Sequence, residues 1–177
     1  PRVLPASDFR GLAAASRPTM GPMSKDAISQ RVARLRAGQD PQCLARLRSG
    51  WAILGKHQPA AVRGCCMLLP DPVVPSPNHL DEAARAAFFS DLVRLGDAIL
   101  AATGAERINY LVLCNQVPEL HGHAIPRFAS EDPKQRLQGP FEAYDFAAAP
   151  IADALGPDRE LFERLRAALT GDAGPRR

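Results

Sequence analysis

Two of the four histidines in this 177-residue chain lie one residue apart, at His121 and His123, in the stretch PELHGHAIPRF (118–128). Neighbouring side chains on a β-strand point to opposite faces, so Glu119, His121 and His123 would share one face. Same-face Cα atoms lie about 6.6 Å apart, because the rise is about 3.3 Å per residue. That separation allows both imidazoles to contact a single phosphate group. The spacing therefore points to chemistry at phosphorus or to a metal site.

The residues alone leave three interpretations of this row open. Ordinary surface histidines explain one imidazole well, but they explain a row of polar groups on an apolar strand poorly. A His-x-His pair can supply two ligands to a metal ion, and His57 and His79 are the other histidines of the chain. Finally, a neutral imidazole can attack a phosphorus atom while neighbouring donors stabilise the charged oxygens.

The sequence around the histidines predicts an α+β chain. Helices are expected over 24–38, over 81–103 with Gly104 as the stop, and over 157–169. Strands are expected in a hairpin over 43–55 that turns at Ser49-Gly50, and over 64–70, 108–114 and 120–126. The expected fold is an antiparallel sheet with a long crossover helix packed on it and a C-terminal helix.

The histidine stretch resembles the active-site strand of the histidine-triad (HIT) superfamily. That family has a His-x-His-x-His pattern followed by two apolar residues and often Pro-Arg, and this chain reads LHGHAIPR over 120–127. Aligned on Pro126-Arg127, His123 takes the place of the third family histidine and His121 that of the second, the nucleophile. Glu119 then takes the place of the first. The order of expected elements agrees, so the resemblance covers about residues 40–130.

The resemblance implies a homodimeric α+β protein that acts on nucleotides. The implied reaction is hydrolysis or transfer at the α-phosphate through a covalent nucleotidyl-histidine, with no cofactor and no bound metal. Dinucleoside polyphosphates and nucleoside phosphoramidates are the implied substrates. His121 would attack the phosphorus, and His123 would stabilise the transition state or assist the leaving group. Asn115 resembles the family's amide residue that holds a phosphate oxygen, and Gln116 is a second candidate.

Other positions are less closely matched to the family. Gln58 lies in a loop at the place where the family binds ribose, and Arg127 could contact phosphate. Glu119 departs from the pattern, because a carboxylate cannot donate a hydrogen bond to phosphate unless it is protonated. It could still orient a neighbouring imidazole or raise its pKa. The loop 115–118 also lacks the glycine-rich stretch that is usual in the family.

Because of these departures, two alternatives to a HIT-like enzyme stay open. One is a non-catalytic nucleotide-binding module that has lost turnover through Glu119 and the short loop. The other is a metal-dependent enzyme that uses His121 and His123 as ligands.

Composition narrows the remaining classes of protein. A chain with 46% hydrophobic and 23% charged residues is typical of a globular domain of this length. The net charge of +3 is mild and its Lys and Arg are scattered, which argues against a nucleic-acid partner. The sequence contains no run of 18 apolar residues, so no membrane span is predicted. The spacing of the four cysteines does not match that of a metal site. We expect a cytoplasmic protein with one domain over 24–177. Residues 1–23 are expected to be a tail that is either upstream sequence or disordered.

Overall fold

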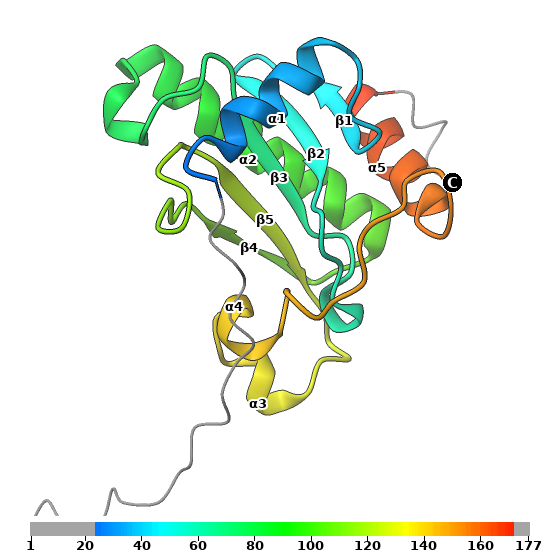
Figure 1. Cartoon of the computed structure of the whole chain (residues 1–177). Helices are drawn as coiled ribbons and strands as arrows, with labels where there is room; N and C mark the ends of the chain where they lie inside the picture. The colour runs from blue at the N-terminus through cyan, green and yellow to red at the C-terminus, as the bar shows by residue number, and fades with distance from the viewer. Residues whose placement is uncertain (1–23, 172–177) are drawn as a thin grey trace, which may run out of the picture.

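Five strands form one antiparallel sheet in the order β1-β2-β3-β5-β4 (Figure 1). The computed structural model describes residues 24–171, so the expected tail over 1–23 lies outside the described residues. The strands are β1 (Cys43–Arg46), β2 (Gly50–Leu54), β3 (Cys66–Pro70), β4 (Arg107–Leu111) and β5 (Gly122–Arg127). The α+β class and the antiparallel sheet expected from the sequence are confirmed.

One long helix connects the two halves of the sheet. The helices are α1 (Ala27–Arg36), α2 (Glu82–Thr103), α3 (Pro133–Arg136), α4 (Pro140–Ala143) and α5 (Arg159–Thr170), with 3₁₀ turns at Ala60–Val62 and Pro77–His79. Helix α2 begins after Asp81, whose carboxylate accepts a hydrogen bond from the Ala84 N–H at 2.7 Å. It ends at Gly104, which has the left-handed φ of 71° that glycine adopts without a steric cost. The expected crossover helix and both of its end signals are confirmed.

Helices α2 and α5 cover one face of the sheet and form the larger core with it. On β2, Ala52 and Leu54 point to this face, and on β5 Ala124 does so. All three are fully buried. The packed helix residues include Phe88, Leu92, Leu95 and Ile99 of α2 and Leu161, Leu165 and Leu169 of α5. The expected C-terminal helix is therefore part of the core.

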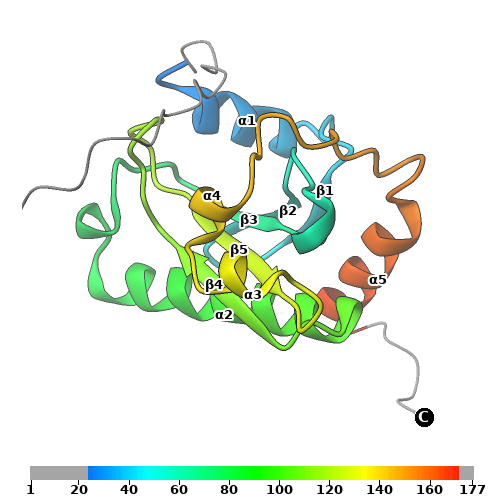
Figure 2. The same ribbon diagram turned by 90° about the horizontal axis from the view of Figure 1, so that it is seen from below.

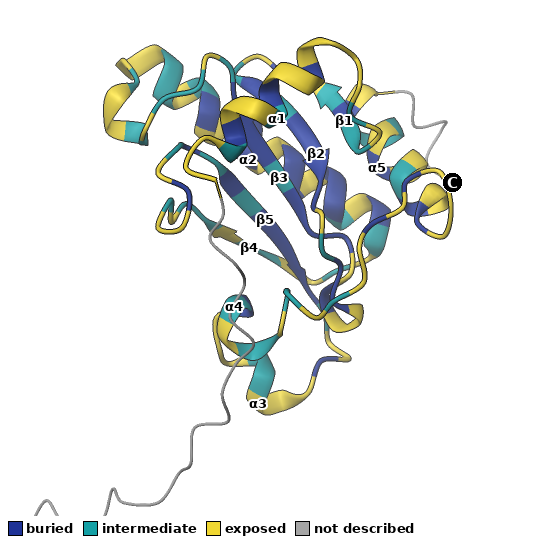
Figure 3. Ribbon diagram, viewed as in Figure 1, coloured by how far each residue is buried: buried dark blue, intermediate teal, exposed yellow. Residues whose placement is uncertain are grey.

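Helix α1 lies against the opposite face of the sheet (Figure 2). Its buried residues are Ile28, Val32 and Leu35, which recur at helical spacing and pack on Ile53 of β2 and Leu69 of β3. Burial colouring shows the central strands enclosed, whereas β4 at the edge of the sheet is largely accessible (Figure 3). The sheet thus has a helix-covered core face and a second face that α1 covers only in part.

Strand β4 is shorter than the sequence predicts. The expected strand over 108–114 ends at Leu111, three residues early. Cys114 has a φ of 53°, a left-handed conformation that is incompatible with an extended strand. The chain therefore turns away from the sheet before it reaches the loop that precedes the histidines.

The segment after β5 returns across the molecule before it enters α5. It passes through α3 and α4, and Ile151 then forms an isolated antiparallel bridge with His57. The Ala152 N–H donates to the Lys56 carbonyl at 2.8 Å, and the Gln58 N–H donates to the Pro150 carbonyl at 2.9 Å. Across residues 24–171, the helices are all too short or too polar to cross a membrane.

Candidate functional site

The positions of β5 serve two faces of the sheet in alternation. Gly122 and Ala124 face α2, and His123 lies on the opposite face with His121, which directly precedes the strand. A Cβ atom at Gly122 would lie 3.0 Å from both terminal methyl carbons of Leu92 and 3.3 Å from the Phe88 ring. The missing side chain therefore lets α2 pack closely behind the histidines. The one-face row expected from the sequence is present for the two imidazoles.

The two imidazoles touch each other edge to face. Their ring centroids are 5.0 Å apart at an interplanar angle of 79°, and both residues are partly buried. Nδ1 of His121 lies 2.7 Å from the backbone carbonyl oxygen of Glu119. A carbonyl oxygen only accepts hydrogen bonds, so Nδ1 carries the proton in this arrangement. The lone pair of the neutral ring is then on Nε2, which is the nitrogen available as a nucleophile.

His123 lies among uncharged neighbours. Across the sheet it pairs with Met67 of β3 and Leu111 of β4, and the Phe141 ring of α4 meets it edge to face at 5.1 Å. Burial, and secondarily the proximity of His121, lower the pKa of His123 from 6.5 to about 4. The imidazole of His123 is therefore neutral at physiological pH.

The carboxylate of Glu119 is bound to helix α1. It accepts hydrogen bonds from the backbone N–H groups of Ile28 at 2.9 Å and Ser29 at 3.0 Å, and from the Ser29 hydroxyl. The residue before the helix, Asp26, makes no capping hydrogen bond with its side chain, so Glu119 satisfies these helix N–H groups. A negative charge at the N-terminus of a helix is also favoured by the helix dipole. Glu119 holds His121 through its backbone carbonyl, whereas its carboxylate caps α1.

The loop before the histidines packs against the rest of the protein through one buried residue. Val117 is buried and belongs to the apolar cluster that Ile28, Val32 and Leu35 of α1 form on the sheet. Asn115 and Gln116, two residues and one residue earlier, are exposed. The structure therefore places both expected phosphate-binding amides at the surface of the loop that leads to His121.

Gln58 is held inside the loop between β2 and β3. Its side-chain NH₂ donates to the carbonyl oxygens of Gly55 at 2.8 Å and Cys65 at 2.9 Å, and its oxygen accepts from the Gly64 N–H at 2.8 Å. The residue is 4% exposed. The polar atoms of Gln58 are thus hydrogen-bonded to backbone groups of the loop, and the residue does not join the histidine pair.

Arg127 lies at the far end of β5 and is also buried. Its guanidinium forms an ion pair with Glu131 at 2.9 Å and donates to the Asn109 side-chain oxygen at 2.6 Å. Sequence reasoning missed both the acid that pairs with Arg127 and the approach of Phe141 to His123, because both depend on how the segment after β5 folds back. Only Glu131, four residues after Arg127, offered a local signal.

The comparisons with known proteins agree with this architecture. No protein-family model matches the sequence, and no curated protein is significantly similar to it. A histidine triad protein from Bradyrhizobium japonicum aligns with a TM-score of 0.60 and 21% identity, over 76% of this chain and 94% of that one. A histidine triad protein from Sinorhizobium meliloti has a TM-score of 0.59 and 24% identity over the same shares.

A third similar structure is a hypothetical histidine triad nucleotide-binding protein from Sulfolobus tokodaii. Its TM-score is 0.60 at 14% identity, over 80% of this chain and 92% of that one. The chain therefore has the fold of histidine triad proteins over most of its length.

Proposed function

We propose that this protein is a HIT-like nucleotide hydrolase or nucleotidyltransferase that acts at the α-phosphate of a dinucleoside polyphosphate or a nucleoside phosphoramidate. The observation that carries the proposal is the hydrogen bond between His121 Nδ1 and the Glu119 carbonyl. It fixes the proton on one ring nitrogen and leaves Nε2 as a nucleophile. The fold and the His-x-His row on the accessible face support the same assignment.

In the first step, Nε2 of His121 forms a bond to the α-phosphorus. The bond from phosphorus to the leaving oxygen or nitrogen breaks, and the leaving group departs with the electron pair. The His121 ring becomes cationic in this step, and the carbonyl of Glu119 stabilises the charge through the Nδ1 proton. His123, which is neutral, donates a hydrogen bond to a phosphate oxygen or to the leaving atom.

In the second step, water or another acceptor attacks the phosphorus and the bond to His121 breaks. The acceptor loses a proton to solvent, the nucleotide leaves, and His121 returns to its neutral form. Asn115 holds a phosphate oxygen during both steps. Gln116, on the same loop, is the second candidate for this role. Both side chains are exposed on the loop before His121, which supports this role.

A homodimer is part of the proposal. Strand β4 is an edge of the sheet, and the nearby apolar side chains of Tyr110 and Leu113 are 42% and 48% exposed. An open strand edge with apolar side chains favours association with a second strand. Light scattering on the purified protein would give the mass of the assembly.

Intact-mass spectrometry tests the covalent step. The protein is mixed with a dinucleoside polyphosphate and quenched rapidly without acid, because phosphohistidine is acid-labile. We expect a mass increase of one nucleotidyl group, absent in His121→Ala, and a loss of turnover on the order of 10³-fold or more in that variant. His79→Ala, which changes an exposed histidine, is the matched control. Turnover by His121→Ala at the wild-type rate would show that His121 is not the nucleophile.

Glu119 favours the alternative of a non-catalytic nucleotide-binding module, because its carboxylate is bound to α1 and offers no donor to substrate. Tight nucleotide binding without product on a panel of phosphoanhydrides and phosphoramidates would establish that alternative. A metal-dependent enzyme would need further ligands near His121 and His123. Within residues 24–171, the structure contains no group of three or more histidine, cysteine or acidic side chains that could hold a metal ion. Metal analysis of the purified protein distinguishes the two mechanisms.

A further inference from the structure

The segment after β5 covers the candidate site from one side. The Phe141 ring on α4 lies 5.1 Å from the His123 ring, and the Phe146 ring lies 4.8 Å from that of Phe141. Both phenylalanines pack against the third apolar cluster, whose buried members are Val62, Cys65 and Ile125. His121, His123, Phe141 and Phe146 thus form a continuous row of rings, in which His123 lies between His121 and Phe141.

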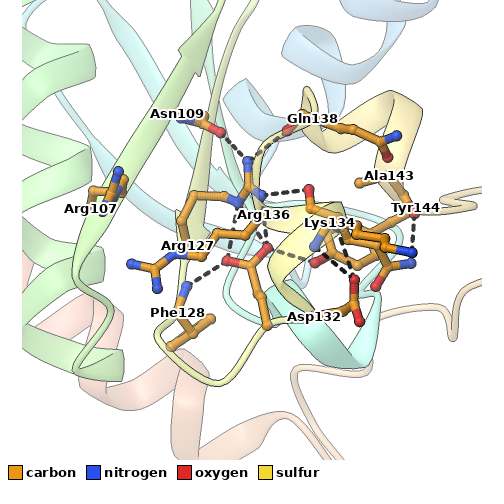
Figure 4. Close-up of polar contacts among 12 residues, drawn as sticks. Arg107, Asn109, Arg127, Phe128, Asp132, Lys134, Arg136, Gln138, Ala143 and Tyr144 are labelled. Atoms are coloured by element: carbon orange, nitrogen blue, oxygen red, sulfur yellow. Dashed lines mark hydrogen bonds and ion pairs between the residues drawn. The ribbon is translucent and has the colours of Figure 1, made fainter.

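A buried ionic network holds this segment on the sheet (Figure 4). The Glu131 carboxylate accepts hydrogen bonds from Arg127 Nε, from the Phe128 N–H at 2.6 Å and from the Tyr144 hydroxyl at 2.6 Å. Its side chain is fully buried. Burial opposes ionisation of Glu131, but the donors from Arg127, Tyr144 and Phe128 outweigh it and lower its pKa. The acid is therefore charged and paired at neutral pH.

Arg127 extends the network to both sides of Glu131. Its guanidinium also donates to the carbonyl oxygens of Gln138 and Gln135, each at 3.1 Å. The first of these precedes α4 and the second lies in α3, so the arginine fastens the backbone on both sides of the turn that leads to Phe141. Tyr144, directly after α4, is bound to the same acid. The position of Phe141 is thus set by contacts on either side of it.

We propose that Phe141 is a positioning residue of the site: held by the Arg127–Glu131–Tyr144 network, it keeps water away from His123 and keeps that imidazole uncharged. The inference rests on the proposed function, in which a neutral His123 donates a hydrogen bond to the phosphate or the leaving atom. It also gives the segment after β5, which lies beyond the sequence resemblance, a defined part in the reaction.

The neighbours of His123 on β3, β4 and α4 carry no charge, so burial is the main reason that its imidazole is neutral. On its own strand it faces His121, and from β3, β4 and α4 it meets Met67, Leu111 and Phe141, which carry no charge. The charged groups further along this face are paired elsewhere, Glu119 with α1 and Arg127 with Glu131. Replacing the Phe141 ring with a small side chain would admit water, and His123 would then titrate closer to the ordinary pKa of histidine.

The test follows the His123 imidazole by ¹⁵N nuclear magnetic resonance in the ligand-free protein, as a function of pH. We expect wild-type His123 to titrate near pH 4, and Phe141→Ala to raise its pKa by about one unit or more. Phe141→Leu, which keeps an apolar cover, should give a smaller rise. Phe89→Ala removes an exposed phenylalanine of α2 and is the control.

An unchanged His123 titration in folded Phe141→Ala would overturn the inference, whatever the turnover. If Phe141→Ala does not fold, Phe141→Leu and Tyr144→Phe decide, and the absence of any shift in both overturns it. If the wild type turns over no nucleotide, the proposed function fails, and the titration still decides whether Phe141 sets the charge of His123.

Discussion

The carboxylate of Glu119 accepts the backbone N–H of Ile28, 91 positions earlier in the chain, at 2.9 Å. The backbone carbonyl of the same residue accepts Nδ1–H of His121 at 2.7 Å. One residue therefore joins the start of α1 to the proposed nucleophile. The sequence resemblance aligns Glu119 with the first histidine of the His-x-His-x-His pattern, and in the structure its carboxylate caps a helix.

Replacing Glu119 should destabilise the protein through α1. Glu119→Ala leaves the N–H groups of Ile28 and Ser29 without their acceptor and should lower the free energy of unfolding by about 1–2 kcal/mol. Glu119→Gln keeps one acceptor oxygen but no charge, and should lose less. Urea unfolding gives both values. Asp26→Ala is the control, since Asp26 adjoins α1 without capping it. Equal losses in Asp26→Ala and Glu119→Ala would contradict the capping role.

The stability of the protein should depend on pH through His123. Its pKa is about 4 in the folded protein and 6.5 without burial, so the unfolded chain binds more protons between these values. The free energy of unfolding should therefore fall as pH drops from about 6.5 to about 4. The part due to His123 is on the order of 3 kcal/mol at the acid end, at 1.36 kcal/mol per pKa unit.

Urea unfolding at several pH values between 7 and 4.5 measures this dependence. His123→Gln should show a shallower decline than the wild type, because the buried titratable group is gone. The carboxylates that also titrate in this range are common to both proteins, so the difference isolates His123. His79→Gln should keep the wild-type slope. Parallel curves for His123→Gln and the wild type would refute the expectation.

Gln58 should affect stability more than substrate binding. Gln58→Leu removes the side-chain partner of the Gly55 carbonyl and of the Gly64 N–H, and one of the two donors to the Cys65 carbonyl, which still accepts from the Gly55 N–H. It should lower the free energy of unfolding by about 2–3 kcal/mol. The KM for a dinucleoside polyphosphate should stay within about twofold for the folded protein. Lys56→Ala, an exposed change in the same loop, should alter neither value. A large rise in KM with unchanged stability would instead support the ribose contact that the sequence resemblance implied.

The parts of the fold that local patterns encode were predictable from the sequence. These parts depend on residues within a few positions of each other: the apolar spacing and end signals of α2, the hairpin over 43–55, the strand that ends at Pro70 and the alternation along β5. The hairpin turn was expected at Ser49-Gly50, and in the structure Gly50 is already the first residue of β2. The strand expected over 120–126 begins at Gly122, two residues late, and the pattern over 108–114 misled further, because apolar residues continue past the end of β4. Strand β4 ends at Leu111, and the left-handed backbone at Cys114 prevents the extended chain from continuing to 114; a cysteine gives no sign of that conformation.

What the sequence could not show are contacts between distant segments. The sequence resemblance aligns Glu119 with a motif position, whereas in the structure its carboxylate caps α1. No residue near Glu119 in the sequence indicates a contact with Ile28. Arg127 follows a proline at the end of a strand, where an exposed phosphate contact was a reasonable expectation. Its burial follows from Glu131 and from the carbonyl groups of the segment that folds over it. Phe141 lies outside the sequence resemblance and reaches His123 only through that same folding.

Because side chains alternate along β5, one short segment has to present the imidazoles on one face of the sheet and pack against α2 on the other. Odd-numbered positions from 121 to 127 lie on the face that carries the two imidazoles, and the even-numbered positions between them supply small or apolar surface to α2. A single inserted or deleted residue within this segment would exchange the two sets. The imidazoles would then lie in the helix-covered core, and folding and the proposed reaction would fail together. Length errors within this segment are therefore far less tolerable than substitutions at any one of its positions.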